Sequence, residues 1–154
     1  MARAAASLDL LSGGRFELGL GAGSFWDAIE AMGGRRLAPR EAVDALGEAI
    51  DIIRGTWDVS DPSRFRVEGA HYREAGAKRG PAPAHDIPIW LGAYRPRMLR
   101  LTGRKADGWL PSLGYVPGLD GLAAANATID EAAVSAGRRP ADVRRLLNVA
   151  GTFS

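Results

Sequence analysis

The chain of 154 residues is 46% hydrophobic and 25% charged, which is typical of a globular protein that can bury a core. Its 20 Lys and Arg side chains exceed its 18 Asp and Glu side chains by only two, so the charge does not indicate a surface for nucleic acid. The absence of cysteine excludes disulfides and thiolate metal sites, and the two histidines, His71 and His85, are too few and too far apart for a typical metal cage. We predict no metal site.

The hydropathy of the chain bears on its location. No apolar run approaches the roughly 18 residues that a membrane-spanning helix needs. The first residues lack the long apolar core of a signal peptide. We therefore expect a cytoplasmic protein with neither a nucleic-acid nor a membrane partner.

The first third of the chain is predicted to alternate helix, strand and helix. Residues 2–11 are alanine-rich and indicate a helix that the glycines of segment 12–14 end. Residues 15–21 alternate apolar and other side chains, which is strand spacing, and end in glycines. Residues 24–33 are predicted to form a short helix or an ordered loop, and the proline at the start of segment 39–57 opens the clearest helix.

The helix predicted over 39–57 has one apolar face. The apolar positions on it follow spacings of three and four: Val43, Leu46, Ala49, Ile50, Ile53 and Trp57. After it, segments 65–68 and 71–74 flank Gly69-Ala70, and two runs joined by two residues predict a β-hairpin. Residues 76–86 hold glycine and proline without periodicity, which indicates a loop.

The second half of the chain repeats strand and helix. Residues 87–93 form a continuous apolar run, which predicts a strand buried on both faces. A proline opens a helix over about 96–105, a short strand follows at 109–112, and a helix at 119–136 precedes a last strand at 145–151. Trp90 and Trp109 are predicted to be core residues.

This alternation of strands and helices predicts a parallel sheet with right-handed crossovers. The pattern gives four parallel strands. A closed barrel needs eight strands and about 250 residues, whereas an open doubly wound sheet can have four or five. The order of elements alone leaves both architectures open.

A glycine-rich turn, Gly19-Leu20-Gly21-Ala22-Gly23, follows the first predicted strand. Such glycines allow a tight turn or the close approach of a ligand to the backbone. A dinucleotide fingerprint needs a third glycine at the position of Ser24, so that interpretation fails.

A methyltransferase is a less favoured alternative. Residues 17–23 resemble the first motif of S-adenosylmethionine-dependent methyltransferases. That family has a second strand ending in an acidic residue about twenty positions later, to bind the ribose hydroxyls. Here no strand fits between Gly23 and Pro39, and residues 39–57 have the pattern of an amphipathic helix instead.

A third interpretation uses almost the whole chain. The string Leu8-Asp9-Leu10-Leu11-Ser12-Gly13-Gly14-Arg15, running into the strand that ends at the glycine turn, resembles the luciferase-like monooxygenase family. Segment 87–93 looks like the family's next strand, and Ala106-Asp107-Gly108-Trp109 looks like the entry to the strand after that. The three motifs occur in the family's order and spacing.

The resemblance implies an α/β fold, a partial (β/α)8 TIM-type barrel containing about strands four to seven. It implies one incomplete barrel domain over residues 1–154, with a hairpin and loop insertion at about 58–86. Members of the family are about twice as long, so three strands would precede Leu8 and one would follow Asn148.

The resemblance also implies a cofactor site at the carboxyl ends of the strands, where such barrels bind their ligands. Residues in three turns would contact the cofactor: Gly21, Ala22, Gly23 and Ser24 beside its ring, Gly92, Ala93, Tyr94 and Arg95 near its ribityl or phosphate part, and Ser112 at a phosphate. Some F420-dependent members have a phosphate-binding lysine where this chain has Tyr115.

The activity implied is oxidoreduction of a small organic substrate with coenzyme F420, by hydride transfer. FMN is the alternative cofactor, and monooxygenation is the alternative reaction. The residues indicate no catalytic acid or base, and a homo-oligomer is an open expectation. A function of another class also stays open: a truncated, non-catalytic remnant that binds a partner through its open sheet edges.

Overall fold

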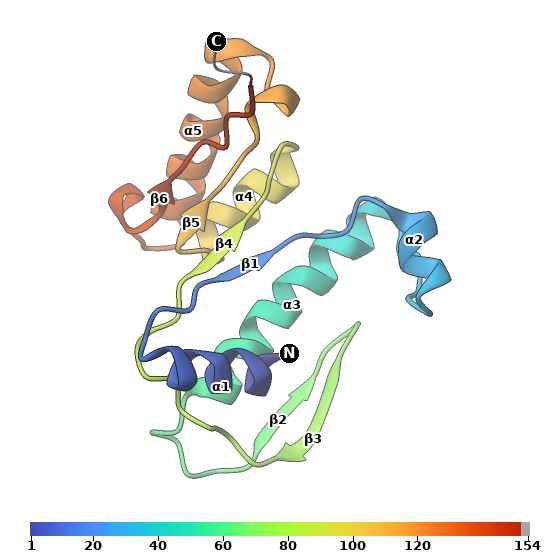
Figure 1. The fold of residues 1–154 in the computed structure, drawn as a ribbon, viewed down its shortest axis with the longest axis vertical. Coiled ribbons are helices and arrows are strands. Elements are labelled where there is room, and N and C mark those ends of the chain that lie inside the picture. The colour runs from blue at the N-terminus through green and yellow to red at the C-terminus, as the bar shows by residue number, and fades with distance from the viewer. Residues whose placement is uncertain (152–154) are drawn as a thin grey trace. The chain divides into compact units, whose positions relative to one another are not determined.

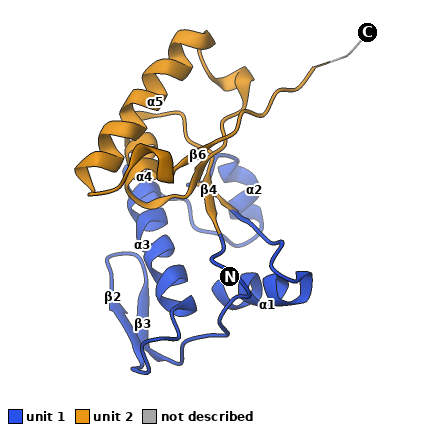
Figure 2. Ribbon diagram, turned by 90° about the vertical axis from the view of Figure 1, so that its left-hand side faces the viewer, with its two compact units in different colours: residues 1–18, 22–87 blue, residues 19–21, 88–154 orange. Residues whose placement is uncertain are grey.

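The computed structural model describes residues 1–151, which form two compact units. Figure 2 colours them: unit 1 consists of residues 1–18 and 22–87, and unit 2 consists of residues 19–21 and the chain from 88 onward. The prediction of a single incomplete barrel domain stays a prediction. Among residues 1–151, no helix is both long and apolar enough to cross a membrane.

Unit 1 contains three helices and a hairpin. The helices are α1 (Ala2–Ser12), α2 (Trp26–Ala31) and α3 (Pro39–Trp57), and the hairpin strands are β2 (Phe65–Glu68) and β3 (Arg73–Ala77). Helices α1 and α3 were predicted, and α3 begins and ends at the predicted residues; for the segment of α2 the prediction left a short helix or an ordered loop open, and the structure has the helix. Helix α1 ends where Gly13 adopts a left-handed conformation with φ of 66°, which glycine tolerates without steric cost.

Helix α3 buries most of its predicted apolar face. Leu46, Ile50, Ile53 and Trp57 are buried, whereas Val43 and Ala49 are only half-buried. The N-terminus of α3 is closed by the carboxylate of Glu41, which accepts a hydrogen bond of 3.0 Å from the backbone N–H of Ala38. Local sequence signals therefore define the start and the packing face of this helix.

The hairpin is confirmed, but its connection is longer than predicted. Four residues join β2 to β3 in place of the two expected, because Glu48 of α3 binds the backbone of this connection. Its carboxylate accepts hydrogen bonds from the N–H groups of Ala70 (2.9 Å), His71 (2.9 Å) and Tyr72 (3.1 Å). These bonds, chiefly that from the His71 backbone, lower the pKa of Glu48.

Asp9 is the buried polar centre of unit 1. Its side chain has no solvent exposure, and it accepts backbone hydrogen bonds from Ala84 (2.8 Å), His85 (3.1 Å) and Phe16 (3.4 Å). Nδ1 of His85 lies 2.9 Å from its carboxylate. Burial alone would raise the pKa of Asp9, but the bonds from His85, Phe16 and Ala84 outweigh burial and lower it. Asp9 thus joins the end of α1 to the loop that precedes unit 2.

Unit 2 is a sheet covered by helices on one face (Figure 1). Strands β1 (Leu18–Leu20), β4 (Ile89–Leu91), β5 (Gly108–Trp109) and β6 (Arg144–Arg145) form a four-stranded sheet in that order. Strand β5 pairs in parallel with both β4 and β6. Trp109 lies opposite Leu91 of β4 and opposite Arg145 of β6. The strands are shorter than predicted, although parallel pairing continues at an isolated bridge between Ser112 and Asn148.

Two helices and two short 3-10 turns complete unit 2. They are α4 (Pro96–Lys105), η1 (Leu113–Tyr115), α5 (Gly118–Ser135) and η2 (Pro140–Asp142). Helices α4 and α5 pack closely because Gly103 has no side chain: a Cβ there would lie 2.2 Å from the carbonyl oxygen of Ile129. Both predicted core tryptophans, Trp90 and Trp109, are buried.

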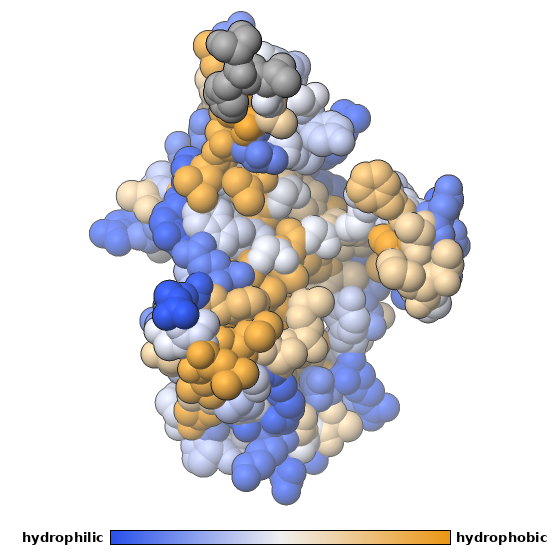
Figure 3. All heavy atoms as spheres, in the orientation of Figure 1, coloured by the Kyte–Doolittle hydropathy of each residue, from blue (hydrophilic) through white to orange (hydrophobic). Residues whose placement is uncertain are grey.

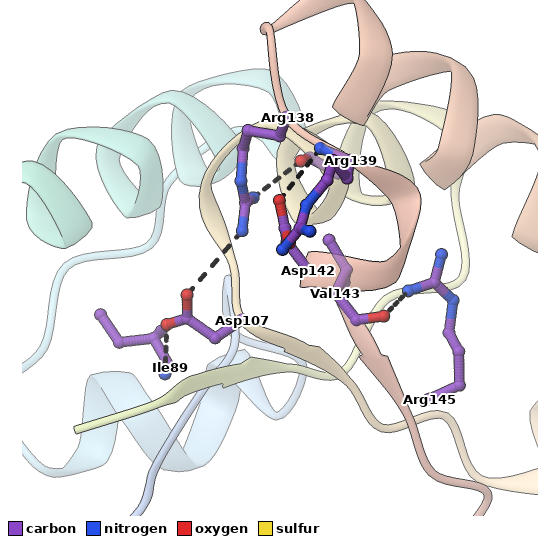
Figure 4. Close-up of polar contacts among 8 residues, drawn as sticks. Ile89, Asp107, Arg138, Arg139, Asp142, Val143 and Arg145 are labelled. Atoms are coloured by element: carbon purple, nitrogen blue, oxygen red, sulfur yellow. Dashed lines mark hydrogen bonds and ion pairs between the residues drawn. The ribbon is translucent and has the colours of Figure 1, made fainter. Parts of the chain in front are cut away.

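The amino ends of β4, β5 and β6 are joined through Asp107 (Figure 4). Its carboxylate accepts a hydrogen bond of 2.9 Å from the N–H of Ile89, and its carbonyl accepts one of 2.8 Å from the N–H of Arg144. A guanidinium nitrogen of Arg138 lies 3.8 Å from an oxygen of the same carboxylate. The motif around Asp107 therefore fixes the amino edge of the sheet.

We expect Asp9→Asn to destabilise unit 1, because an amide offers one acceptor oxygen to N–H groups that now meet two. The pKa of Asp9 is lowered in the folded state, so its contribution is present above about pH 4 and is lost as the pH falls through the folded pKa. Urea unfolding of both proteins from about pH 7 to about pH 3 should show the largest difference at neutral pH.

Asp86→Asn is the control for this experiment, because Asp86 is an exposed carboxyl in the same loop. Its unfolding midpoint should follow that of the unmodified chain at every pH. An Asp9→Asn protein as stable as the control at neutral pH would show that the Asp9 contacts do not hold unit 1 together.

Candidate functional site

The loops that follow β4 and β5 lie at the same edge of unit 2. Because these strands pair in parallel, residues 92–95 and 110–115 leave the sheet side by side. The N–H of Leu110 donates to the carbonyl of Leu91 over 3.0 Å, which continues the pairing to the start of both loops. We call residues 92–95 and 110–115 the carboxyl rim.

Three contacts hold the two loops of the carboxyl rim together. The indole Nε1 of Trp109 donates a buried hydrogen bond of 2.9 Å to the carbonyl of Ala93. The N–H of Ser112 donates to the hydroxyl of Tyr94 over 2.9 Å. The rings of Tyr94 and Tyr115 are tilted by 58°, with centroids 5.5 Å apart. The predicted site residues Ala93, Tyr94 and Ser112 are therefore brought together.

Asn148 extends the carboxyl rim from the segment after β6, and the sequence did not single it out. Its Nδ2 donates to the hydroxyl of Ser112 over 3.1 Å, and its carbonyl accepts from the N–H of Leu113 over 2.9 Å. The one signal available was a polar residue within the apolar part, 146–150, of the predicted strand. Because the Ser112 oxygen accepts from Asn148, its hydroxyl proton is left to donate to a ligand.

The start of α4 offers backbone donors beside a bare stretch of main chain. Arg95 is the residue before the helix, no side chain caps the N-terminus, and the first turn contains no acidic residue. Gly92 is exposed, and a Cβ there would meet only the carbonyl oxygen of Leu110, at 3.8 Å. A helix N-terminus of this kind favours a negatively charged ligand group.

The glycine turn after β1 is divided between the two units. Gly21 belongs to unit 2, and a Cβ there would meet no atom within 4 Å. Ala22, Gly23 and Ser24 belong to unit 1, where Gly23 has φ of 94° and packs against the ring of Trp26. A side chain at position 23 is therefore disfavoured twice, by the positive φ of the backbone and by the ring of Trp26. A contact of these four residues with a cofactor ring stays a prediction.

No metal centre accompanies these groups in the described part of the chain: residues 1–151 contain no cluster of three His, Asp or Glu side chains that could hold an ion. The polar and aromatic groups of the carboxyl rim are therefore backbone donors, the hydroxyls of Tyr94, Ser112 and Tyr115, two aromatic rings and the Arg95 guanidinium. This set can bind an anionic group and a flat ring.

Comparison with known proteins gives a consistent result. The family model described as luciferase-like monooxygenase matches residues 1–151. An F420-dependent glucose-6-phosphate dehydrogenase of Nakamurella multipartita is 31% identical over 141 residues, covering 85% of this chain and 40% of that protein. A phthiodiolone/phenolphthiodiolone dimycocerosates ketoreductase of Mycobacterium kansasii is 35% identical over 144 residues, covering 92% of this chain and 37% of that protein. The chain thus spans about two fifths of these relatives.

Solved structures show the same fold. An F420-dependent secondary alcohol dehydrogenase in complex with an F420-acetone adduct superposes with a TM-score of 0.79 at 18% identity, covering 95% of this chain and 43% of that one. A riboflavin lyase with modified FMN superposes with a TM-score of 0.78 at 21% identity, covering 95% and 36%. Their TIM-barrel fold confirms that this chain is part of a barrel and not an open doubly wound sheet.

We expect Trp109→Phe to lower the free energy of unfolding by about 1–3 kcal/mol, because the carbonyl of Ala93 is then buried without its donor. Tyr94→Phe is the matched comparison. It removes the acceptor of the Ser112 N–H, which is near solvent, so water replaces the bond and the loss stays below about 1 kcal/mol. Urea unfolding measures both, and equal losses would contradict a special role for the buried bond.

Proposed function

Since the chain belongs to the luciferase-like monooxygenase family, we propose that it supplies part of the cofactor site of a coenzyme F420-dependent oxidoreductase. The reaction proposed is hydride transfer between the cofactor and a small organic substrate. The F420-dependent relatives in the comparisons support this cofactor, and the fold shared with a riboflavin lyase keeps FMN as the alternative.

The carboxyl rim is the observation that carries this proposal. A cofactor with a ribityl and phosphate tail needs bare main chain beside the tail and positive groups beside the phosphate. Gly92 provides the first, and the uncapped start of α4 together with Arg95 provides the second. The hydroxyl of Ser112 adds a donor. The residues present therefore fit such a cofactor, although Tyr115 replaces the lysine of some F420-dependent members.

Each element of the carboxyl rim has a part in the proposed reaction. When bound, the cofactor supplies the hydride chemistry. The backbone at Gly92 lets the ribityl part of the cofactor lie close, and the N–H groups at the start of α4 orient the charged tail. The bond from Trp109 fixes the Ala93 carbonyl, so the backbone is positioned before a ligand arrives. The rings of Tyr94 and Tyr115, one from each loop, pack against each other.

The methyltransferase alternative gains no support. Residues 24–38 contain the helix α2 and no strand. The second strand of a methyltransferase, whose last residue would be the acidic residue that binds the ribose, is therefore absent from this segment. The family match over residues 1–151 also favours the oxidoreductase. The remaining alternative, a remnant that binds a partner without catalysis, predicts a different result in the experiment below.

Titration of the 154-residue chain with F420 should quench the cofactor's fluorescence with a micromolar dissociation constant. Gly92→Val should raise that constant about tenfold or more, because the added side chain occupies the space of the ligand while the chain itself has room for its Cβ. Ala127→Val, on an exposed position of α5, is the control and should bind as the unmodified chain does.

The same titration with FMN identifies the preferred cofactor. A chain that is folded by circular dichroism but quenches neither F420 nor FMN contradicts the proposal and favours the non-catalytic remnant. Equal binding by Gly92→Val and the control would place the cofactor away from the carboxyl rim.

A further inference from the structure

We propose that the substrate taken at this site is an apolar organic molecule, with an alkyl or aromatic body, and not a sugar phosphate. This inference rests on the proposed function, because it assigns the carboxyl rim to a substrate as well as to a cofactor. It starts from residues 110–119, Leu-Pro-Ser-Leu-Gly-Tyr-Val-Pro-Gly-Leu, which include no charged residue. A surface loop of this composition is unusual, because loops normally expose polar side chains.

Three large apolar side chains of this segment are exposed. Leu110 is 41% exposed, Tyr115 72%, and Leu119, in the first turn of α5, 78%. Single exposed apolar residues need no explanation, but several in one loop at a ligand-binding edge of a sheet indicate a binding surface. The loop therefore presents apolar area to whatever approaches the carboxyl rim.

Two neighbouring segments extend this apolar surface. Tyr94, from the loop after β4, packs its ring against Tyr115 and is itself 40% exposed. Its hydroxyl already accepts the hydrogen bond from Ser112, so the ring contributes mainly apolar contact. The segment after β6 pairs with the loop through Asn148, and hydrophobic side chains cover its surface in Figure 3. The exposed apolar residues of that segment are Leu146, Leu147 and Val149.

The charged groups of the carboxyl rim favour an apolar substrate over a sugar phosphate. A phosphate needs cationic partners, and its sugar hydroxyls need hydrogen-bonding groups, or binding loses the free energy of their hydration. The cationic side chain of the carboxyl rim is Arg95, which stands with the start of α4 at the proposed position of the cofactor's own phosphate. The loop over 110–119 adds no further cation for a second phosphate, but it offers leucine and tyrosine side chains to an alkyl chain or a ring.

Saturation-transfer NMR on the 154-residue chain tests this assignment with two probes, 2-decanone and glucose 6-phosphate. We expect saturation of 2-decanone and none of glucose 6-phosphate. Tyr115→Lys and Leu119→Lys should each weaken the 2-decanone signal about threefold or more, because a charge replaces apolar contact area. Tyr72→Lys is the matched control: Tyr72 is 45% exposed but lies in the hairpin connection of unit 1, so its replacement should leave the signal unchanged.

Two results overturn the inference: saturation of glucose 6-phosphate equal to or stronger than that of 2-decanone, or a 2-decanone signal that neither lysine substitution lowers. Circular dichroism of each variant confirms that the fold is intact. The F420 titration separates this outcome from failure of the proposed function. If the chain binds F420 but not 2-decanone, the cofactor proposal stands and the apolar substrate is ruled out. If it binds 2-decanone at Tyr115 but no cofactor, the oxidoreductase proposal is ruled out.

Discussion

The parallel pairing of β4, β5 and β6 is the constraint on which the rest of unit 2 depends. Asp107 fixes this pairing at the amino edge by bonding to the backbone of β4 and of β6 at once. At the opposite edge, the buried bond from Trp109 to the carbonyl of Ala93 fixes the point where the strands end. Because both edges are held, the loops that follow the strands leave the sheet at set positions, and those loops carry the candidate site.

In the carboxyl rim, the main chain and the side chains suit different ligands. Main chain at Gly92 and at the start of α4 suits a flat, negatively charged cofactor, and it needs little side-chain ordering to do so. The side chains of the loop over 110–119 suit an apolar partner. Unit 1 has its own polar centre at Asp9, and its hairpin is held by Glu48.

The sequence predicted what is determined locally and missed what depends on distant partners. Helix α3 was predicted to the residue because a proline and a regular apolar spacing define it within its own segment. Strands were predicted in the right order but too long, since the length of a strand depends on its neighbours in the sheet. The hairpin connection differed because Glu48, more than twenty residues away, binds its backbone. Asn148 was missed for the same reason: its role follows from Ser112, 36 residues earlier. The family could be recognised because its motifs are local strings.

Amide hydrogen exchange of the chain with and without F420 is the most direct test of a cofactor site at the carboxyl rim. The cofactor should slow exchange at the start of α4 and in the loop after β5, around Met98 and Leu113, because both belong to or adjoin the carboxyl rim. Exchange at Ile89 and Arg144, on the amino edge beside Asp107, should not change. Protection confined to the amino edge, or to the hairpin of unit 1, would contradict a cofactor site at the carboxyl rim.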